Sequence, residues 1–423
     1  MKKTDFRYNT YVKILEEELV PAMGCTEPIA IAYAAAKARD TLGTLPERII
    51  CEVSGNIIKN VKSVVVPHTS GLRGIGSAAA IGAFAGDAGG ELEVLSSVSE
   101  EQTFALKEYI DSIEIEIFHK ETDHAFDITV SVFKNDDSAS VRLAGRHTNI
   151  VSIEKNGQKL FESPVIEEEK KTNREVLTVE GIVDFADSVD VSDVCDVINR
   201  QIDYNMAIAV EGLKNDYGAN IGKVLLHGKE NVMHRKMRAY AAAGSDARMN
   251  GCELPVVINS GSGNQGITAS VPVIVFANHM GYSREKLIRA LCVSNLVTTH
   301  LKTGIGCLSA YCGVVSAGAA AASGVAYLMG GGLNTVAHTI VNTLAMDSGI
   351  ICDGAKASCA AKISSAIDAG MLGLNMYLQG NQFYGGDGIV TKGVEATIAN
   401  VGRIAREGMC GTDREIIKLM MEN

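Results

Sequence analysis

The segments Thr303-Gly-Ile-Gly-Cys307 and Cys352-Asp-Gly-Ala-Lys-Ala-Ser-Cys359-Ala-Ala-Lys362 enclose the most unusual part of this chain. Residues 303–346 include no Asp, Glu, Lys or Arg, and Gly313–Gly324 consists wholly of Gly, Ala, Ser and Val. Because small side chains let backbones approach closely, this composition predicts tightly packed helices at the centre of the molecule. The thiols at the two ends suit either a soft metal centre or an inert core, and the stretch alone leaves both readings open.

The overall composition predicts a soluble globular protein. The chain has 423 residues, 46% hydrophobic and 21% charged, with a formal net charge of -11. This length allows two or three domains, and the negative charge argues against nucleic-acid binding, which needs basic patches. The first residues, Met1–Tyr8, are polar and no apolar signal-like run follows, so we expect a cytoplasmic protein. Its ten cysteines are then reduced thiols, available for metal binding or catalysis.

The uncharged stretch is long enough to cross a bilayer twice, but its composition favours a buried core. It is rich in Ala, Gly and Ser, it contains Asn334, His338 and Asn342, and Gly330–Gly332 interrupts it. It also lacks the Trp and basic flanks that mark a membrane interface. We therefore expect core helices and no membrane association.

The N-terminal part begins with a predicted amphipathic helix over Thr4–Glu18, followed by a turn into the Ala-rich helix Ile29–Ala38. Thr26 is a suitable N-cap for this second helix. Cys25 would then lie beside a helix N-terminus, where the dipole stabilises a thiolate. An ordinary small residue in a turn would give the same sequence, so both interpretations of Cys25 stay open.

Several short β-branched runs predict strands, among them Val61–Val66 and Glu91–Ser96, and Asp111–Phe161 predicts an antiparallel meander. His68 lies in a Gly-rich turn after the first run, where it is either a general base or a polar loop residue. His147-Thr148-Asn149 places three hydrogen-bonding side chains at the start of a strand, which suits a site or an exposed edge.

A polar segment, Glu162–Arg174, separates this region from a second half with mainly helical periodicity. We therefore predict an α+β fold with two domains. Residues 1–165 would form an N-terminal domain with a small antiparallel β meander and helices. Residues 166–423 would form a mainly α-helical catalytic domain, with the active site between the two.

The segment Val256–Ile267 is the best candidate for a ligand loop. It places neutral hydrogen-bonding side chains among glycines and leads into an apolar helix, which suits a small zwitterion or carboxylate. An ordinary loop is the alternative, but the density of polar groups between two apolar runs favours a ligand site. The side chains expected to contact substrate there are Ser260, Ser262, Asn264 and Gln265.

Taken alone, the spacing of Cys307, Cys352 and Cys359 is not a zinc pattern, because no Cys-x-x-Cys pair occurs in the chain. Three thiolates do suffice for a 4Fe–4S cluster that leaves one iron open to substrate. The combination of motifs resembles the L-cysteine desulfidase family, which is related to the catalytic alpha part of bacterial iron–sulfur L-serine dehydratases. The resemblance covers most of the chain and rests on Met23–Pro28, Asn259–Gly266, Thr303–Cys307, Cys352–Cys359 and the small-residue helix after Cys307.

The resemblance implies an iron–sulfur β-eliminase that does not use pyridoxal phosphate. It assigns Cys307, Cys352 and Cys359 as cluster ligands, although the gap between the last two is shorter than in the dehydratases. It implies that Cys25 is a fourth ligand or a reactive thiol, because the dehydratases have a Ser/His/Thr-rich motif there. The expected base is His147 or His68. Further substrate contacts are expected from Thr26, Asn149 and Lys302.

The resulting hypothesis is β-elimination of L-cysteine to sulfide, ammonia and pyruvate by a cytoplasmic homodimer. L-serine or another β-substituted amino acid is the nearest alternative substrate, because the sequence does not separate a thiol from a hydroxyl leaving group. A non-enzymatic iron–sulfur redox sensor is an alternative of another class, which the polar loop disfavours. A pyridoxal-phosphate lyase would need Lys302 or Lys356 as its Schiff-base lysine, and the sequence offers no convincing phosphate cup.

Overall fold

The computed structural model describes residues 1–23, 26–165, 172–227, 232–306 and 309–422, which fold into two units. Unit 1 contains Met1–Gly24, Lys171–Cys352 and Ala357–Asp413, and unit 2 contains Cys25–Lys170, Asp353–Lys356 and Arg414–Asn423. The chain therefore passes between the units several times. The expectation of two sequential domains, 1–165 and 166–423, stays a prediction.

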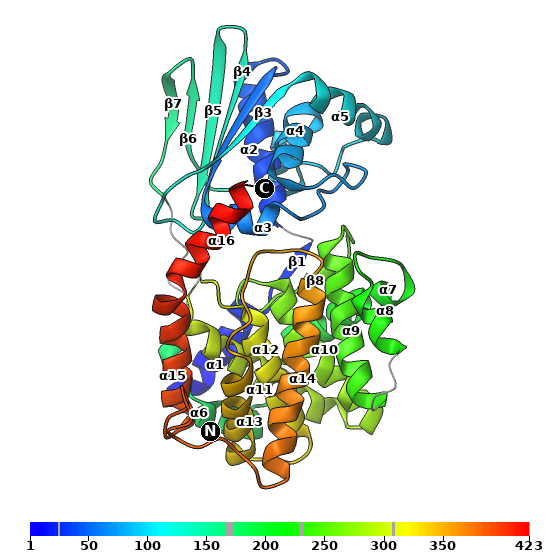
Figure 1. Ribbon diagram of the computed structural model, residues 1–423, viewed down its shortest axis with the longest axis vertical. Coiled ribbons are helices and arrows are strands. Elements are labelled where there is room, and N and C mark those ends of the chain that lie inside the picture. Colours follow the sequence, from blue (N-terminus) through cyan, green and yellow to red (C-terminus); the bar gives the residue numbers. More distant parts are fainter. Residues whose placement is uncertain (24–25, 166–171, 228–231, 307–308, 423) are drawn as a thin grey trace. The chain divides into compact units, whose positions relative to one another are not determined.

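Unit 2 is built on a six-stranded sheet with the strand order β3-β2-β4-β5-β6-β7. Strands β2 and β3 pair in parallel, whereas every other neighbouring pair is antiparallel. Figure 1 shows α2 and α4 against one face of this sheet, where they contact β2, β4 and β5. The elements are α2 (Thr26–Leu42), β2 (Arg48–Val53), α3 (Gly55–Val61), α4 (Gly74–Ala85), η1 (Ala88–Glu93), α5 (Glu100–Ser112), β3 (Glu114–His119), β4 (Asp127–Lys134), β5 (Asp137–Ala144), β6 (Ile150–Lys155) and β7 (Gln158–Glu162).

The sequence correctly predicts the antiparallel meander over β4–β7, but β3, which it placed in that meander, pairs in parallel with β2, and two other expected strands are wrong. Val61–Val66 covers the end of α3 and the turn after it, and Glu91–Ser96 begins in the 3-10 helix η1. Both are short apolar runs, and such runs do not distinguish a strand from a buried helix by periodicity. The alternation in β4 and β5 is clear because one face is covered by α2 while the other is more open.

Unit 1 is almost entirely helical. Among its described residues the one sheet is the short antiparallel pair of β1 and β8, in which Pro21 lies opposite Val257. Its elements are α1 (Phe6–Glu18), β1 (Pro21–Met23), η2 (Arg174–Val176), α6 (Val179–Ser188), η3 (Val191–Asp193), α7 (Cys195–Lys214), α8 (Ile221–Leu226), α9 (Val232–Met249), β8 (Pro255–Val257), α10 (Gly263–Met280), α11 (Arg284–Thr303), α12 (Gly313–Leu328), α13 (Leu333–Asp347), α14 (Cys359–Leu378), α15 (Val394–Arg403), η4 (Ile404–Gly408) and the start of α16 (Cys410–Glu422).

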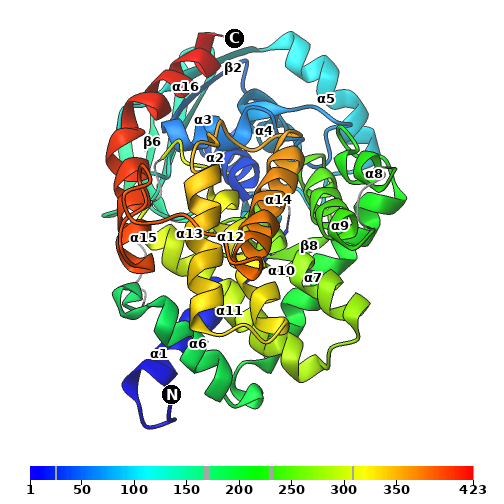
Figure 2. The ribbon, with the colours of Figure 1, turned by 60° about the horizontal axis from the view of Figure 1, so that its bottom comes forward.

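The small-residue helix α12 is the centre of unit 1, as the sequence predicts. It contacts α10, α11, α13 and α14, which surround it in Figure 2. A Cβ on Gly318 would lie 2.5 Å from the carbonyl oxygen of Ala366 in α14, and a Cβ on Gly370 would lie 2.6 Å from the carbonyl oxygen of Gly318. Helices this close need small residues at the crossing, so the low side-chain volume of α12 follows from its position.

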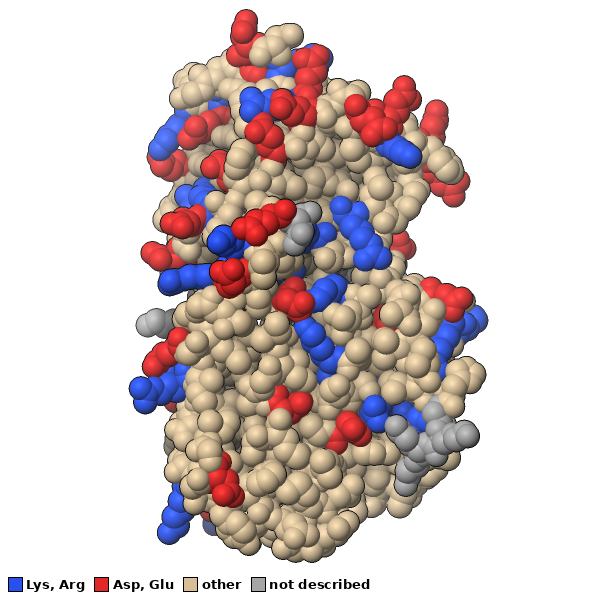
Figure 3. Space-filling view, viewed as in Figure 1, with Lys and Arg blue, Asp and Glu red and all other residues tan. Residues whose placement is uncertain are grey.

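Part of the surface of unit 1 carries few charged side chains. On the face shown in Figure 3, charged side chains are sparse over the lower part of unit 1, where α13 and α14 lie. Asp347 is the one charged residue of α13, and α14 contributes Lys362 and Asp368. No described helix has both the length and the hydropathy that a membrane span requires. The expected α+β fold class, with a mainly helical C-terminal half, is confirmed.

Candidate functional site

Two cysteines of unit 1 are brought together by a short antiparallel pairing of distant segments. The backbone N–H of Cys312 donates to the carbonyl of Ile350 at 3.0 Å, and Tyr311 forms an isolated β-bridge with Ile351. The N–H of Cys352 completes the pairing by donating to the carbonyl of Ala310. The side chains of Cys312 and Cys352 lie close enough to interact as a result, and Cys352 contributes most to the raised pKa of Cys312.

A third thiol, Cys359, lies close enough to influence this pair electrostatically. Cys359 is the first residue of α14, and Cys312 is the N-cap of α12, so two of the three thiols lie at helix N-termini. The interaction with Cys352, burial of Cys312 and the neighbouring Cys359 raise the pKa of Cys312 well above its ordinary value. The protonated thiol of Cys312 is therefore favoured in this environment, and a bound metal would reverse this by stabilising the thiolate.

The donor set fits a soft metal centre in its chemistry. The described cysteines form no disulfides, and three adjacent sulfur donors are the ligands that iron–sulfur clusters take. Within the ranges that the structure describes, no three His, Cys, Asp or Glu side chains are already arranged as a metal site. Cys25 and Cys307 lie outside the described residues, and their proposed roles stay predictions.

Cys312 is the ligand candidate that sequence reasoning missed. Its local signal is its place directly before the small-residue helix, where an N-cap is expected. This signal is weak, because Cys is not a preferred capping residue. The pairing with Ile350–Cys352 is a long-range contact, and nothing in the local sequence specifies it.

The predicted ligand loop forms a tight turn at the start of α10. Asn259 and Ser262 exchange two backbone hydrogen bonds, Ser260 adopts a φ of 49°, and the Ser262 hydroxyl accepts from the backbone N–H of Gln265 at 3.4 Å. The Ser260 hydroxyl donates to the Asn259 side chain at 2.8 Å. Both hydroxyls therefore shape the loop, and Ser262 acts as a helix cap.

Gln265 connects this loop to the thiols. Its side chain lies against Gly313, the residue after Cys312, where a Cβ would be 2.6 Å from the Gln265 amide carbon. Gln265 is 6% exposed, and its Oε1 atom is buried without a hydrogen-bond donor among the described residues. An unsatisfied buried acceptor is costly unless a ligand supplies the missing donor. Asn264, one residue earlier, accepts from Arg248 at 3.5 Å.

A buried amide network fixes the base of the loop. Asn259 donates to the side chain of Asn295 at 3.0 Å, and Asn295 and Gln201 exchange hydrogen bonds of 2.7 and 2.9 Å. All three residues are 0% exposed. Such a fully satisfied network holds the turn in one conformation. Lys302 lies further along α11, where its ammonium donates to the carbonyl of Gly306 at 2.8 Å and so closes the turn after the helix.

A second group of polar and charged side chains includes Tyr311, the residue directly before Cys312. The buried Tyr311 is hydrogen-bonded through its hydroxyl to Ser348 at 3.3 Å, and Asp347 is close enough to act on it electrostatically. Burial and the neighbouring Asp368 raise the pKa of the Asp347 carboxyl to about 6. Arg238 of α9 donates to Asp368 at 3.3 Å. These residues were not found from the sequence, because they come from separate helices.

In unit 2 the structure brings together two of the predicted residues. Thr26 begins α2, and its hydroxyl is hydrogen-bonded to Nε2 of His147 at 3.0 Å. The His147 ring also lies against Phe126, with 4.6 Å between ring centroids. These contacts fix the orientation of the imidazole, as a catalytic base requires.

The other two predicted residues of unit 2 have structural contacts of their own. The Asn149 side chain donates to the carbonyl of Ala144 at 2.9 Å and closes the turn before β6. His68 is exposed in a turn with a φ of 56°, and its carbonyl accepts from the Thr103 hydroxyl at 3.1 Å. Of the two candidate bases, His147 is therefore the one whose ring is held by neighbours.

Comparison with known proteins identifies the family. The family model of the serine dehydratase alpha chain matches residues 89–418, which is more than three quarters of the chain. A UPF0597 protein of Desulfitobacterium hafniense is 54% identical over 100% of this chain and 98% of its own length. UPF0597 proteins of Lachnoclostridium phytofermentans and Treponema denticola are 48% and 47% identical, covering 98% and 99% of this chain and 100% and 99% of their own lengths. The relation to serine dehydratase alpha chains predicted from the motifs is confirmed, and the chain belongs to this family.

Proposed function

We propose that this protein is an iron–sulfur-dependent carbon–sulfur lyase that converts L-cysteine to sulfide, ammonia and pyruvate. The observation that carries the proposal is the grouping of Cys352 with Cys312 and Cys359, which lie at the starts of α12 and α14. The family supports a lyase, since its model is that of a serine dehydratase alpha chain.

Cys312, Cys352 and Cys359 are the proposed ligands of a 4Fe–4S cluster. Such a cluster, held by three thiolates, supplies a Lewis-acidic iron that the protein leaves open. The sequence-based assignment used Cys307 in place of Cys312. The structure favours Cys312 among the described residues, because its thiol lies close enough to that of Cys352 to interact with it.

The proposed substrate contacts come from the turn at the start of α10. A substrate ammonium or thiol group can donate to the buried Oε1 of Gln265, which has no donor among the described residues. A substrate carboxylate is favoured near the N-terminus of α10 by the helix dipole and backbone N–H groups. Both interactions suit a small zwitterionic amino acid.

His147 is the proposed base that removes the α-proton, and the Thr26 hydroxyl holds its imidazole in place. Loss of the α-proton together with hydrosulfide leaves aminoacrylate. Addition of water to the tautomer of aminoacrylate then gives pyruvate and ammonia. Asn149, His68 and Lys302 stay predicted contributors: the side chains of Asn149 and Lys302 donate to backbone carbonyls, and the described contact of His68 is made by its own carbonyl.

L-serine is the second candidate substrate, favoured by the family model. Its reaction is the same except that water leaves in place of hydrosulfide. A non-enzymatic iron–sulfur sensor is the alternative of another class. The buried and unsatisfied Gln265 acceptor speaks against it, because a sensor needs no small-molecule contact there. Cytoplasmic location and a homodimeric state stay predictions.

The decisive experiment uses protein purified without oxygen. Its visible spectrum, iron and acid-labile sulfide are measured first, and sulfide and pyruvate are then assayed with L-cysteine and separately with L-serine. We expect a broad brown absorbance and equal amounts of sulfide and pyruvate from L-cysteine. Pyruvate from L-serine alone would shift the assignment to a dehydratase. A distinct yellow aldimine band would indicate pyridoxal phosphate, and absence of iron after reconstitution would exclude the cluster.

A further inference from the structure

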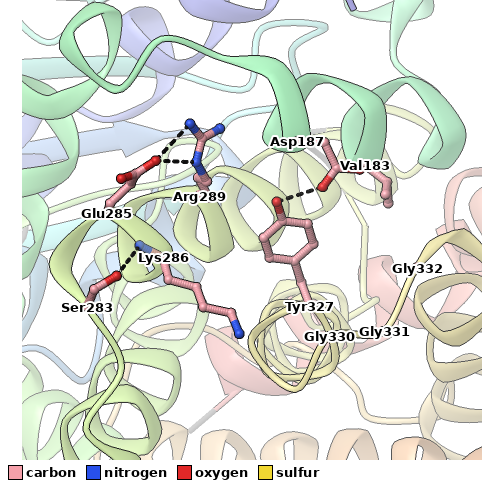
Figure 4. A pocket seen from close by; sticks show the side chains of 10 residues that line it. All are labelled: Val183, Asp187, Ser283, Glu285, Lys286, Arg289, Tyr327, Gly330, Gly331 and Gly332. Atoms are coloured by element: carbon pink, nitrogen blue, oxygen red, sulfur yellow. Dashed lines mark hydrogen bonds and ion pairs between the residues drawn. The ribbon is translucent and has the colours of Figure 1, made fainter.

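A pocket of unit 1 lies far from the thiol of Cys312. It has a volume of about 440 Å³ and is formed by α6, the start of α11, the end of α12 and the glycine turn after α12. Figure 4 shows Lys286, Arg289 and Tyr327 around it, together with Gly330–Gly332. Cys312 caps one end of α12 and Tyr327 lies in the last turn at the other. A helix of 16 residues is about 24 Å long, so this pocket is separate from the proposed catalytic site.

Each charged side chain that lines the pocket has a described hydrogen bond or ion pair, with the exception of Lys286. The Tyr327 hydroxyl donates to Asp187 at 2.8 Å. Arg289 pairs with Glu285 at 3.1 Å and donates to the carbonyl of Ala186 at 2.7 Å. Lys286 lies 4.5 Å from the ring centroid of Tyr282, and no described carboxylate forms an ion pair with it. In Figure 4 its ammonium reaches into the pocket, so Lys286 is the cation available to a ligand.

The remaining wall supplies main chain and apolar surface. Gly330, Gly331 and Gly332 have no side chains to fill the space, and α13 begins at Gly332 without a side-chain cap. The opposite side is formed by the buried Val183 and the ring of Tyr327. A ligand therefore meets one cation and an apolar surface within one cavity.

We propose that this pocket binds the carboxylate of a small organic acid. Lys286 would pair with the carboxylate, and the organic part would pack on Val183 and Tyr327. The charge balance selects a monoanion. The carboxylates of Asp187 and Glu285 also line the pocket, so they would repel a phosphate dianion more strongly than a carboxylate with one negative charge. This site goes beyond the proposed lyase activity and does not depend on it.

The test measures binding of para-fluorobenzoate to the purified full-length protein by fluorine NMR, with para-fluorobenzyl alcohol as the neutral analogue. We expect the acid to bind with millimolar or better affinity and the alcohol to bind at least about fivefold more weakly. Inorganic phosphate at equal concentration should not displace the acid. Equal binding of acid and alcohol, no binding of the acid, or displacement by phosphate would each overturn the proposal.

The variants Lys286→Gln and Lys286→Arg assign the binding to this pocket. Lys286→Gln should weaken binding of the acid about five- to tenfold, and Lys286→Arg should retain most of it because the charge remains. Lys223→Gln is the matched control, since Lys223 is on α8 and pairs with Asp216 at 2.6 Å. Unchanged affinity in Lys286→Gln would overturn the assignment. The comparison of acid with alcohol uses the unaltered protein, so it decides the question even if a variant is unstable.

Discussion

Cys312 and Cys352 lie on facing segments with their thiols close enough to interact, because residues 310–312 pair antiparallel with residues 350–352. This relationship joins the N-cap of α12 to the segment before α14. It explains why the two ends of the uncharged stretch lie together in unit 1. It also makes the assignment of Cys312 as a cluster ligand testable by substitution.

The first prediction separates Cys312 from Cys307. Cys312→Ser should lower iron content and lyase activity together by about tenfold or more, since a hydroxyl does not replace a thiolate ligand. Iron, sulfide and visible absorbance are measured on anaerobically prepared protein. Cys292→Ala is the control, because Cys292 is a buried cysteine within α11 and should leave the iron content unchanged. If Cys307→Ser loses the iron and Cys312→Ser retains it, the original assignment of Cys307 holds instead.

A second prediction concerns the contact between Thr26 and His147. Thr26→Ala removes the hydroxyl that holds Nε2 of His147 and should lower kcat about tenfold, with a smaller change in KM. His147→Ala should lower kcat about a hundredfold or more if His147 is the base. Pyruvate release is followed under steady-state conditions. Thr41→Ala is the matched control in the same helix, because its hydroxyl donates only to the carbonyl of Lys37 at 2.8 Å. Wild-type kcat in both active-site variants would refute the role.

The third prediction tests the packing of α12. Gly318→Ala places a methyl group 2.5 Å from the carbonyl oxygen of Ala366, so α12 and α14 must move apart. We expect the free energy of unfolding to fall by about 1–3 kcal/mol, measured by urea denaturation. Gly411→Ala is the control, since no atom lies within 4 Å of its Cβ position and alanine is the better helix former. Its stability should be unchanged or slightly higher, and an equal loss in both variants would contradict the packing argument.

The fourth prediction is a pH dependence that comes from Asp246. This residue is 1% exposed, accepts from the backbone N–H of Gly222 at 2.9 Å, and has a second oxygen without a donor among the described residues. Burial raises the pKa of its carboxyl to about 6 from its ordinary value of 3.8. The folded state therefore binds the proton more tightly than the unfolded state does.

The direction in which stability changes with pH follows from this difference in pKa. The stabilising effect of the proton is complete below the unfolded pKa near 3.8 and is lost as the pH rises through about 6. Asp246→Asn cannot ionise, so its stability relative to the wild type should increase by about 2 kcal/mol between pH 4 and pH 8. Urea denaturation of both proteins at the two pH values measures this. A constant difference would show that Asp246 titrates normally.

The sequence alone determined the parts of this fold that depend on local pattern. The alternation in Asp127–Lys134 and Asp137–Ala144 specified the hairpin of β4 and β5, since side chains on a strand alternate between two faces. The absence of charge and of bulky residues in Gly313–Gly324 specified a buried, closely packed helix. The resemblance of the motifs specified the family, which the comparisons confirm.

Tertiary structure decided everything that depends on which distant segments meet. The parallel pairing of β2 with β3 joins segments that are separated by α3, α4 and α5, and no local periodicity encodes it. The contact between Thr26 and His147 links a helix start to a turn of the sheet. The partnership of Cys312 with Cys352 likewise depends on backbone hydrogen bonds between Ala310–Cys312 and Ile350–Cys352. Residue type and spacing reveal which side chains can do chemistry, whereas the choice among ten cysteines depends on contacts made only when the chain has folded.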